Sequence, residues 1–223
     1  MEKFFRRLHW VSIAVIGVQV LIWTVTGFAF TLFDFEDVRG KYEKSDDKID
    51  LPATFDIPKA RTALGSRTVL EARCKLMAGR PIVDFRTTDG AVLVEGDRIV
   101  SPITEQDAVA VAAGALKKPP SVRNVRRQEV AVAEYDMELP AWRVEFDDRK
   151  DTTIYVSPTT GEVIARRNRK WRSFDVLWSL HVLGYISRSN PAHWPLRIVG
   201  FLSLLVVVSG IGIAITSLRR KNA

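Results

Sequence analysis

Three histidines are the residues of this chain whose type best suits cofactor chemistry: His9, His181 and His193. Each lies in or beside an apolar segment near one end of the chain, and none lies in the long polar middle. A b-type haem in a membrane is commonly held by two histidines that face each other from neighbouring helices. The histidines are therefore interpreted either as haem ligands, with His9 and His181 as the pair, or as packed, hydrogen-bonded side chains.

Other catalytic signatures are missing from the sequence, which contains no HExxH, GxSxG, CxxC, P-loop or GxGxxG pattern. Triad or metal-hydrolase chemistry in the polar middle needs a histidine or cysteine there, and Cys74 is the only such residue. Its neighbours, residues 69–76, predict a strand, so Cys74 is interpreted as a buried structural thiol. We expect no catalytic residue and no metal site in this part of the chain, and no enzymatic activity of its own.

Two uncharged apolar runs, residues 10–33 and 198–218, determine where the histidines lie. About 20 apolar residues of helix cross a bilayer core of roughly 30 Å. We therefore predict transmembrane helices over residues 10–33 and 196–218. The first run is longer than the apolar part of a signal peptide, and no small-residue cleavage site follows it. An uncleaved anchor is expected.

Basic residues flank both runs: Lys3, Arg6 and Arg7 precede the first, and residues 219–221 follow the second. The positive-inside rule then places residues 1–9 and 219–223 in the cytoplasm. The polar middle would lie on the opposite face of the inner membrane, in the periplasm of a Gram-negative bacterium.

In that topology the histidines of the expected haem pair lie on opposite sides of a span. His9 and His181 would be about 30 Å apart, so one copy of the chain cannot bring both to one iron. Pairing of His181 with His193, or of equivalent histidines from two copies, stays open.

The formal net charge of +7 is unevenly distributed. Apart from the two ends, the excess of positive charge lies in one cluster: Arg166, Arg167, Arg169, Lys170 and Arg172. The rest of the polar middle is mildly acidic, which argues against nucleic-acid binding. The basic cluster is interpreted either as a contact for lipid headgroups, worth about 1 kcal/mol per charge, or as a docking patch for an acidic partner.

The polar middle contains a weak internal repeat, in which residues 80–102 resemble residues 139–165. Each copy alternates apolar and polar residues, as half-buried antiparallel strands do, and its turns contain glycine, which suits hairpins. A helix is expected before each copy, opened by Pro58 in the first and by Thr104 in the second. The predicted fold is α+β, with units 56–102 and 103–168 that each contain a helix and antiparallel strands. One such unit is small for a stable core, so the two are expected to pack together after a linker, 34–55.

A specific family resemblance accompanies the second copy. Residues 140–146 (PAWRVEF) and 153–163 (TIYVSPTTGEV) resemble a PepSY domain. Residues 171–181 (WRSFDVLWSLH), 6–10 (RRLHW) and 35–40 (FEDVRG) resemble segments of membrane-anchored PepSY proteins. The resemblance implies that the chain inhibits or chaperones a protease, or acts as a sensor at the cell envelope.

Larger relatives with four spans resemble haem-bearing reductases of ferric siderophores, and some carry ligands at the positions that match these histidines. This chain departs from that pattern, with two predicted spans and three histidines in all.

Patterns of polar and small residues predict how the helices pack. Residues 171–190 are expected to form an interfacial or re-entrant helix, because their apolar stretch is too short to span. In the first span Ser12, Gln19 and Thr26 form one stripe, and Gln19 is costly against lipid, so it should face protein. The second span has a face of small residues that permits close helix contact: Gly200, Ser203, Gly210 and Ala214. We interpret these faces as contacts between the two spans, or with a membrane partner or a second copy.

The favoured function is that of a non-enzymatic inner-membrane protein of the PepSY type. Its periplasmic part would bind or stabilise a partner, as an accessory subunit of a larger membrane complex, without a cofactor. One alternative is a haem-b electron-transfer subunit of a ferric-siderophore-reductase-like system, with His9 and His181 as ligands. A further alternative is a regulator of an envelope protease.

Overall fold

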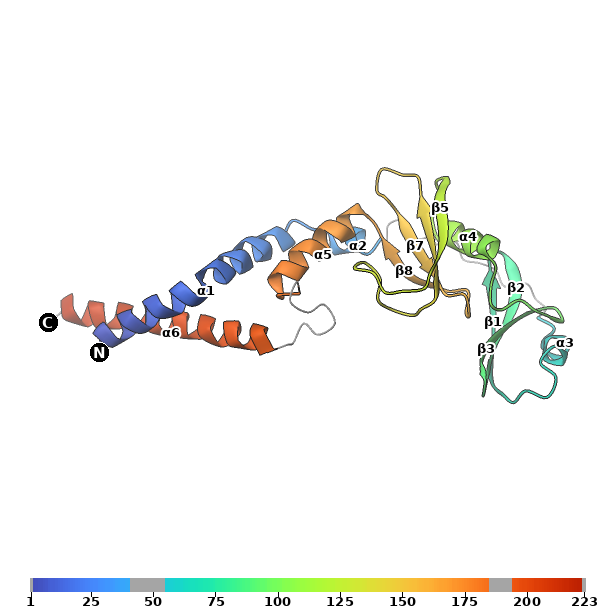
Figure 1. Ribbon diagram of the computed structural model, residues 1–223, viewed down its shortest axis with the longest axis horizontal. Helices are drawn as coiled ribbons and strands as arrows, with labels where there is room; N and C mark the ends of the chain where they lie inside the picture. Colours follow the sequence, from blue (N-terminus) through green and yellow to red (C-terminus); the bar gives the residue numbers. More distant parts are fainter. Residues whose placement is uncertain (1, 41–54, 185–193, 222–223) are drawn as a thin grey trace. The chain divides into compact units, whose positions relative to one another are not determined.

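The structure, a computed structural model, describes residues 2–40, 55–184 and 194–221. The chain divides into two compact units: a helical unit of Met1–Asp34 with Ser173–Ala223, and a body of Phe35–Arg172. Two long apolar helices near the ends of the chain thus flank a body of two antiparallel sheets (Figure 1). This much of the predicted α+β architecture is confirmed.

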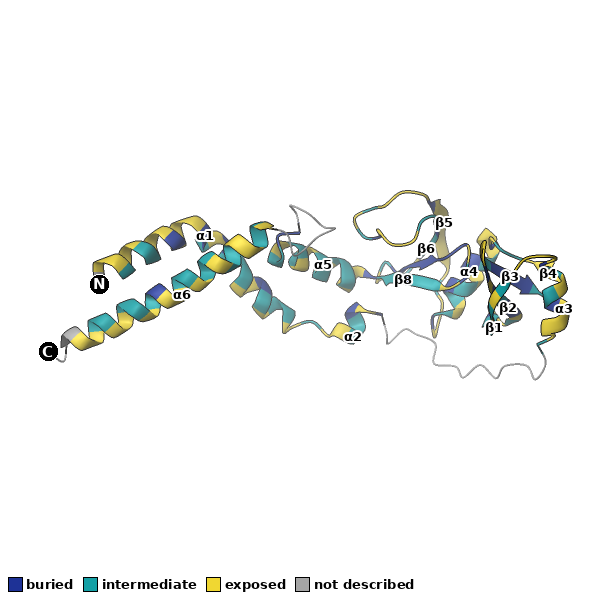
Figure 2. Cartoon of the chain, turned by 90° about the horizontal axis from the view of Figure 1, so that it is seen from below, coloured by how far each residue is buried: buried dark blue, intermediate teal, exposed yellow. Residues whose placement is uncertain are grey.

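Helices α1 (Glu2–Phe30) and α6 (Trp194–Lys221) lie side by side in the helical unit, with both chain ends at the same end of the pair (Figure 1). Both are long and apolar enough to span a membrane. α1 begins before the uncharged run because its first residues are good helix formers. α6 begins two residues before the predicted span, since a proline such as Pro195 is tolerated in the first turn of a helix. Figure 2 shows exposed residues along both helices.

Helix α5 (Arg169–His181) links the body to the helical unit. Asn168 caps its first turn, where the side-chain oxygen accepts a hydrogen bond of 2.7 Å from the Trp171 backbone N–H. At the other end the Gly184 N–H donates to the Ser179 carbonyl, and Leu183 has φ 55°, which together are typical of a Schellman motif. The helix therefore ends well before the predicted boundary at residue 190, and residues 185–190 lie outside the described part.

The first predicted unit, residues 56–102, forms helix α3 (Ile57–Thr62) and a four-stranded sheet. Asp56 caps α3 by accepting from the Lys59 backbone N–H at 2.9 Å, and Pro58 occupies its first turn. The sheet is an antiparallel meander, and Gly90, at φ 125°, follows the turn between its second and third strands. Its strands are β1 (Val69–Met77), β2 (Arg80–Thr87), β3 (Gly90–Glu95) and β4 (Arg98–Ile99).

The second predicted unit, residues 103–168, repeats this pattern with helix α4 (Glu105–Gly114) before a second meander. Thr104 and Asp107 form a capping box at the start of α4, since each side chain bonds the backbone N–H of the other residue. The two sheets are separate rather than one continuous sheet. The strands are β5 (Val122–Gln128), β6 (Ala141–Phe146), β7 (Thr153–Val156) and β8 (Val163–Arg167).

One apolar core joins the two sheets within the body. It combines side chains of the first sheet, such as Leu93, with Ala108 and Ala112 of α4 and with residues of the second sheet, such as Val144 and Phe146. These five residues are completely buried. Figure 2 shows buried residues concentrated in the strands of this region. The two repeats therefore depend on each other, as expected for units too small to hold a core separately.

The outer face of each sheet has its own cover. In the first sheet Ala60 of α3 and Leu64, just after that helix, join a second cluster around Phe85. In the second sheet the loop between β5 and β6 contributes Tyr135, whose ring stacks on that of Tyr155 with centroids 4.0 Å apart. The body is thus layered, with both sheets buried on both faces over part of their area.

A close contact locks the turn between β7 and β8 onto the first sheet. Gly161 has φ +66°, and a Cβ added there would stand 2.5 Å from Met77 Sδ. The Lys75 ammonium supports the same turn, because it donates to the Thr160 carbonyl at 2.7 Å and to the Asp84 carboxylate at 2.6 Å. A side chain at Gly161 would therefore force the buried Met77 side chain to shift.

Replacing Gly161 by alanine is expected to lower the free energy of unfolding of the body by about 2–4 kcal/mol. About 1–2 kcal/mol comes from the left-handed backbone, and the rest comes from overpacking against Met77. Gly96→Ala is the matched control, because Gly96 has a similar φ of +62° but nothing within 4 Å of an added Cβ. Urea unfolding of the full chain in detergent, followed by circular dichroism, measures both. Equal losses in the two variants would contradict the close contact.

Candidate functional site

An aromatic cluster joins α5 to the C-terminal half of α1. The Phe30 ring lies 5.1 Å from that of Phe174 and 5.2 Å from that of His181, measured between centroids. Trp23 and Trp178 flank the same imidazole, each with its centroid within 6.3 Å. The described part of α5 thus runs beside α1 (Figure 1), so that aromatic packing surrounds His181.

Two side chains of α1 satisfy the C-terminal end of α5. Gln19 Nε2 donates to the Leu180 carbonyl at 3.2 Å, and Trp23 Nε1 donates to the His181 carbonyl. The last carbonyls of a helix have no partner within it, and an unpaired carbonyl in apolar surroundings costs several kcal/mol. Gln19, 9% exposed, therefore faces protein. These bonds let α5 end beside the middle of α1, as a re-entrant helix would.

Hydrogen bonding to the side chain of Thr26 determines which ring nitrogen of His181 carries a proton. His181 Nδ1 lies 2.8 Å from Thr26 Oγ1, and that hydroxyl donates its own proton to the Ile22 carbonyl at 2.7 Å. If the hydroxyl gives its one proton to that carbonyl, Nδ1 is the donor to Oγ1. In the neutral imidazole this tautomer leaves Nε2 without a proton, which is the state in which an imidazole ligates a metal.

The same tautomer follows for His9, whose partners lie on α6. His9 Nδ1 is 3.1 Å from the Val206 carbonyl and 3.1 Å from Ser209 Oγ. A carbonyl only accepts, and the Ser209 hydroxyl donates to the Leu205 carbonyl at 2.6 Å. Nδ1 is therefore the donor, and in the neutral imidazole this tautomer again leaves Nε2 without a proton.

The two histidines nonetheless do not fit one haem within a single copy. His181 bonds Thr26, and 17 residues of α1 separate Thr26 from His9, which corresponds to about 25 Å along a helix. This agrees with the separation expected from the sequence. His193 lies outside the described residues. Across the described residues, no group of three or more His, Cys, Asp and Glu side chains is arranged to hold a metal ion.

The small-residue face of α6 is not the face that packs most closely on α1. Contact with α1 centres on the buried Ser209 and on Gly212, where an added Cβ would stand 2.9 Å from the Phe5 ring. Gly210 lies at the edge of that contact, where an added Cβ would stand 3.4 Å from His9 Cε1. Gly200 has no described atom within 4 Å of such a Cβ, Ala214 is exposed, and Ser203 is half-buried with its hydroxyl bonded to the Val199 carbonyl.

The five residues of the basic cluster have hydrogen-bond or ion-pair partners within the body. The sequence had suggested that these charges face lipid or an acidic partner. Arg166 donates to the Ala115 carbonyl at 2.8 Å and Arg167 to the Glu134 carbonyl at 2.8 Å. Arg169 pairs with Asp151 at 2.9 Å, Lys170 with Asp37, and Arg172 with Glu134 at 2.8 Å. Arg169, Lys170 and Arg172 thus connect the first turn of α5 to the body, and the interpretation of the cluster as a lipid or partner contact stays a prediction.

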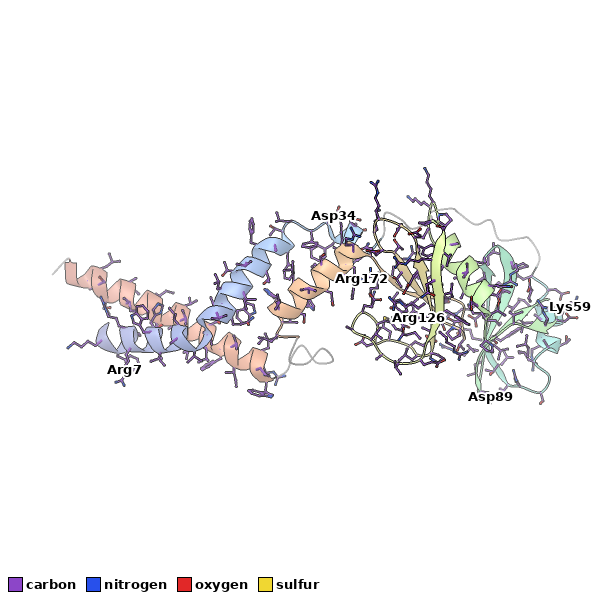
Figure 3. All side chains as sticks on the ribbon, turned by 45° about the horizontal axis from the view of Figure 1, so that its top comes forward. Arg7, Asp34, Lys59, Asp89, Arg126 and Arg172 are labelled. Carbon is purple, nitrogen blue, oxygen red and sulfur yellow. The ribbon has the colours of Figure 1, made fainter. Side chains whose placement is uncertain are left out.

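A half-buried polar network around Glu134 was not predicted from the sequence. One carboxylate oxygen accepts from the Tyr155 hydroxyl at 2.9 Å and from Arg143 at 2.8 Å, and the other accepts from Arg172. Figure 3 labels Arg172 at the beginning of α5. Burial, and then the neighbouring Glu134 carboxylate, raise the pKa of Tyr155 well above its ordinary value. The only feature of the sequence that could have indicated this network is the acidic loop, residues 134–138, which has three carboxylates beside a tyrosine.

Cys74 lies on β1, as predicted, and is half-buried beside the core of the first sheet. Because no histidine lies in the body, the thiol has no imidazole there to activate it. Its interpretation as a structural residue stands as a prediction.

Comparisons with known proteins find no match for this chain. Models of protein families, curated proteins and solved structures were all compared with it, without a match. The resemblance to PepSY proteins, which depends on residues 140–181 above all, therefore stays a prediction from the sequence.

Replacing Tyr155 by phenylalanine is expected to remove part of the alkaline sensitivity of the body. An unfolded tyrosine ionises near pH 10, while the raised pKa keeps the folded Tyr155 protonated. Its contribution to stability is therefore complete below about pH 10 and declines as the pH rises further. The variant also loses about 1–3 kcal/mol at neutral pH with the bond to Glu134. Urea midpoints between about pH 8 and pH 11 test this, and parallel curves for both proteins would contradict it.

Proposed function

We propose that this chain is a membrane-anchored protein of the PepSY type that serves as a non-enzymatic accessory subunit. In this proposal α1 and α6 span the inner membrane of a bacterium, and α6 binds a transmembrane helix of a partner protein. The body lies on the periplasmic side, where it binds or stabilises the partner. The observation that carries the proposal is the small-residue face of α6 that α1 does not cover at Gly200 and Ala214.

Helix packing supports this choice of contact surface. Small residues let two helix backbones approach closely, and this packing is a main source of helix association in membranes. Two polar side chains of the α1 stripe already have hydrogen-bond partners within the helical unit: Gln19 bonds α5, and Thr26 bonds its own helix and His181. They need no partner protein, whereas the small-residue face of α6 offers a surface for close helix contact.

The flanking charges support the topology. Lys3, Arg6 and Arg7 lie near the N-terminus and Arg219 near the C-terminus, and the two chain ends lie at the same end of the helix pair (Figure 1). Basic residues remain in the cytoplasm when helices insert. Both ends would then be cytoplasmic and the body periplasmic.

The rigid start of α5 supports a role in holding the body. Asn168 is 4% exposed; it caps α5 and also donates from Nδ2 to the Asp37 carbonyl at 3.0 Å. The segment that enters the body and the segment that leaves it are thereby bound together. A body whose two ends are bound to each other suits a subunit that presents a binding surface.

Replacing Gly200 and Ala214 together by leucine is expected to reduce the amount of partner that co-purifies in mild detergent by about tenfold, because bulky side chains separate the helices. Val208→Leu is the control, since Val208 is an exposed residue of α6 outside the small-residue face. Retention of the partner at the wild-type level by the double variant would refute the proposed surface. A complex with the mass of two copies would identify the partner as a second copy of the chain.

A second candidate function, electron transfer through haem b, is favoured by the tautomers of the two histidines. In His181 and His9 alike, Nδ1 lies against an oxygen acceptor, and in the neutral tautomer with the proton on Nδ1 the Nε2 atom is available to a metal, as in ligating histidines. Because one copy does not bring them together, the haem would lie between equivalent histidines of two copies. Bound haem would supply one-electron chemistry, and this chain would orient the imidazoles through Thr26 and Ser209.

The absorbance spectrum of the full chain purified from haem-replete cells tests this second candidate. A Soret band that is lost in His181→Ala is the expected result if His181 is a ligand. Thr26→Val is the matched variant, which should keep the band but shift it, because the imidazole loses the acceptor for its Nδ1 proton. Colourless wild-type protein would remove the candidate.

A further inference from the structure

A cavity of about 410 Å³ opens on the body, beside the end of α4. One wall is the segment that follows α4, with Leu116, Lys117, Lys118 and Pro120, and the other is the turn between β6 and β7, residues 148–152. Its volume lies in the range of small-molecule sites. The sequence analysis assigned no role to either segment.

The lining of this cavity combines a basic rim with an apolar floor. Four cationic residues line the cavity: Lys117 and Lys118 from one wall, and Arg149 and Lys150 from the other. Asp148 is the single carboxylate in the lining. All four cationic side chains are exposed, whereas Leu116 is buried and Pro120 half-buried. The cavity therefore concentrates positive charge around an apolar surface.

The carboxylate of Asp148 is engaged by the turn itself. Its two oxygens accept from the Thr152 backbone N–H at 2.8 Å and from the Thr152 hydroxyl at 2.6 Å. The neighbouring Asp151 faces Arg169 and Arg123, and its hydrogen bond with Arg169 lowers the pKa of that carboxyl. Both carboxylates are therefore already engaged by other groups of the body. Like charges held close together repel each other and favour an incoming anion.

Both walls of the cavity are fixed before any ligand arrives. The Asp147 N–H donates to the Ser121 carbonyl at 2.8 Å, which joins the turn to the segment after α4. The Arg169 N–H donates to the Lys150 carbonyl at 2.7 Å, and Arg166 holds the Ala115 carbonyl at the end of α4. Paired prolines, Pro119 and Pro120, restrict the backbone of the other wall. A preformed site binds without the entropy cost of ordering its walls.

We propose that this cavity binds an amphipathic anion: a phosphate or carboxylate group attached to a short apolar chain. The anionic group lies among the rim cations, to which Lys118 and Arg149 contribute from opposite walls. The apolar chain covers Leu116 and Pro120. This inference is independent of the partner surface on α6, because every residue that carries it belongs to the body.

Octyl phosphate is the probe that tests the site, with the full chain in nanodiscs of uncharged phosphatidylcholine. Isothermal titration should show saturable binding of one molecule per chain after subtraction of empty nanodiscs. Inorganic phosphate lacks the apolar chain and should bind at least about tenfold more weakly. Octyltrimethylammonium has the chain with the opposite charge and should show no saturable binding.

Charge-neutral variants locate the site. Lys118→Gln with Arg149→Gln should weaken octyl phosphate binding at least about tenfold, with unchanged thermal unfolding. The matched control is Lys59→Gln with Arg126→Gln, which removes two exposed cations from elsewhere on the body (labelled in Figure 3) and should bind as the wild type does.

Three outcomes would overturn the proposal. The first is binding no greater than that of empty nanodiscs. The second is equal weakening by the control pair, which would indicate non-specific attraction between charges. The third is equal affinity for inorganic phosphate, which would mean that the apolar floor contributes nothing.

Discussion

The hydrogen bonds of Asn168 are the constraint that holds the two ends of the body together. Its side chain caps α5 and also donates to the backbone of Asp37, so one buried amide binds the two segments that connect the body to the helical unit. Lys170 and Arg172 reinforce the same point through Asp37 and Glu134. A change at this residue would remove the cap of α5 and the bond to Asp37 at once.

Helix α1 has a corresponding role in the helical unit. Its N-terminal half packs on α6, with His9 bonded to Val206 and Ser209, and its C-terminal half packs on α5 through the aromatic cluster. Gln19 and Trp23 supply the donors that a helix end needs in apolar surroundings. Helices α5 and α6 thus both pack on the one continuous helix α1, and polar side chains of α1 supply hydrogen bonds to α5.

The sequence predicted those features that follow from local pattern. The apolar helices followed from length, the hairpins from alternation and glycine turns, and the start of α4 from the capping residues Thr104 and Asp107. Which face of α6 packs on α1 did not follow, because a helix suited to lipid is apolar on every side. The partners of Arg172 and Gln19 were also hidden, since one is a carboxylate 38 residues away and the other is a backbone carbonyl, which no residue type reveals.

The separation of α1 from its partner helices along the sequence has a consequence for biogenesis in the proposed topology. α1 is made first, but α5 and α6 follow only after the whole body, Phe35–Arg172, has been synthesised. At translation rates of about 5–20 residues per second, α1 waits for roughly 7 to 30 seconds. During that interval Ser12, Gln19 and Thr26 lack the helices that bury them. The insertion machinery or a neighbouring subunit must shield this stripe until the last helix leaves the ribosome.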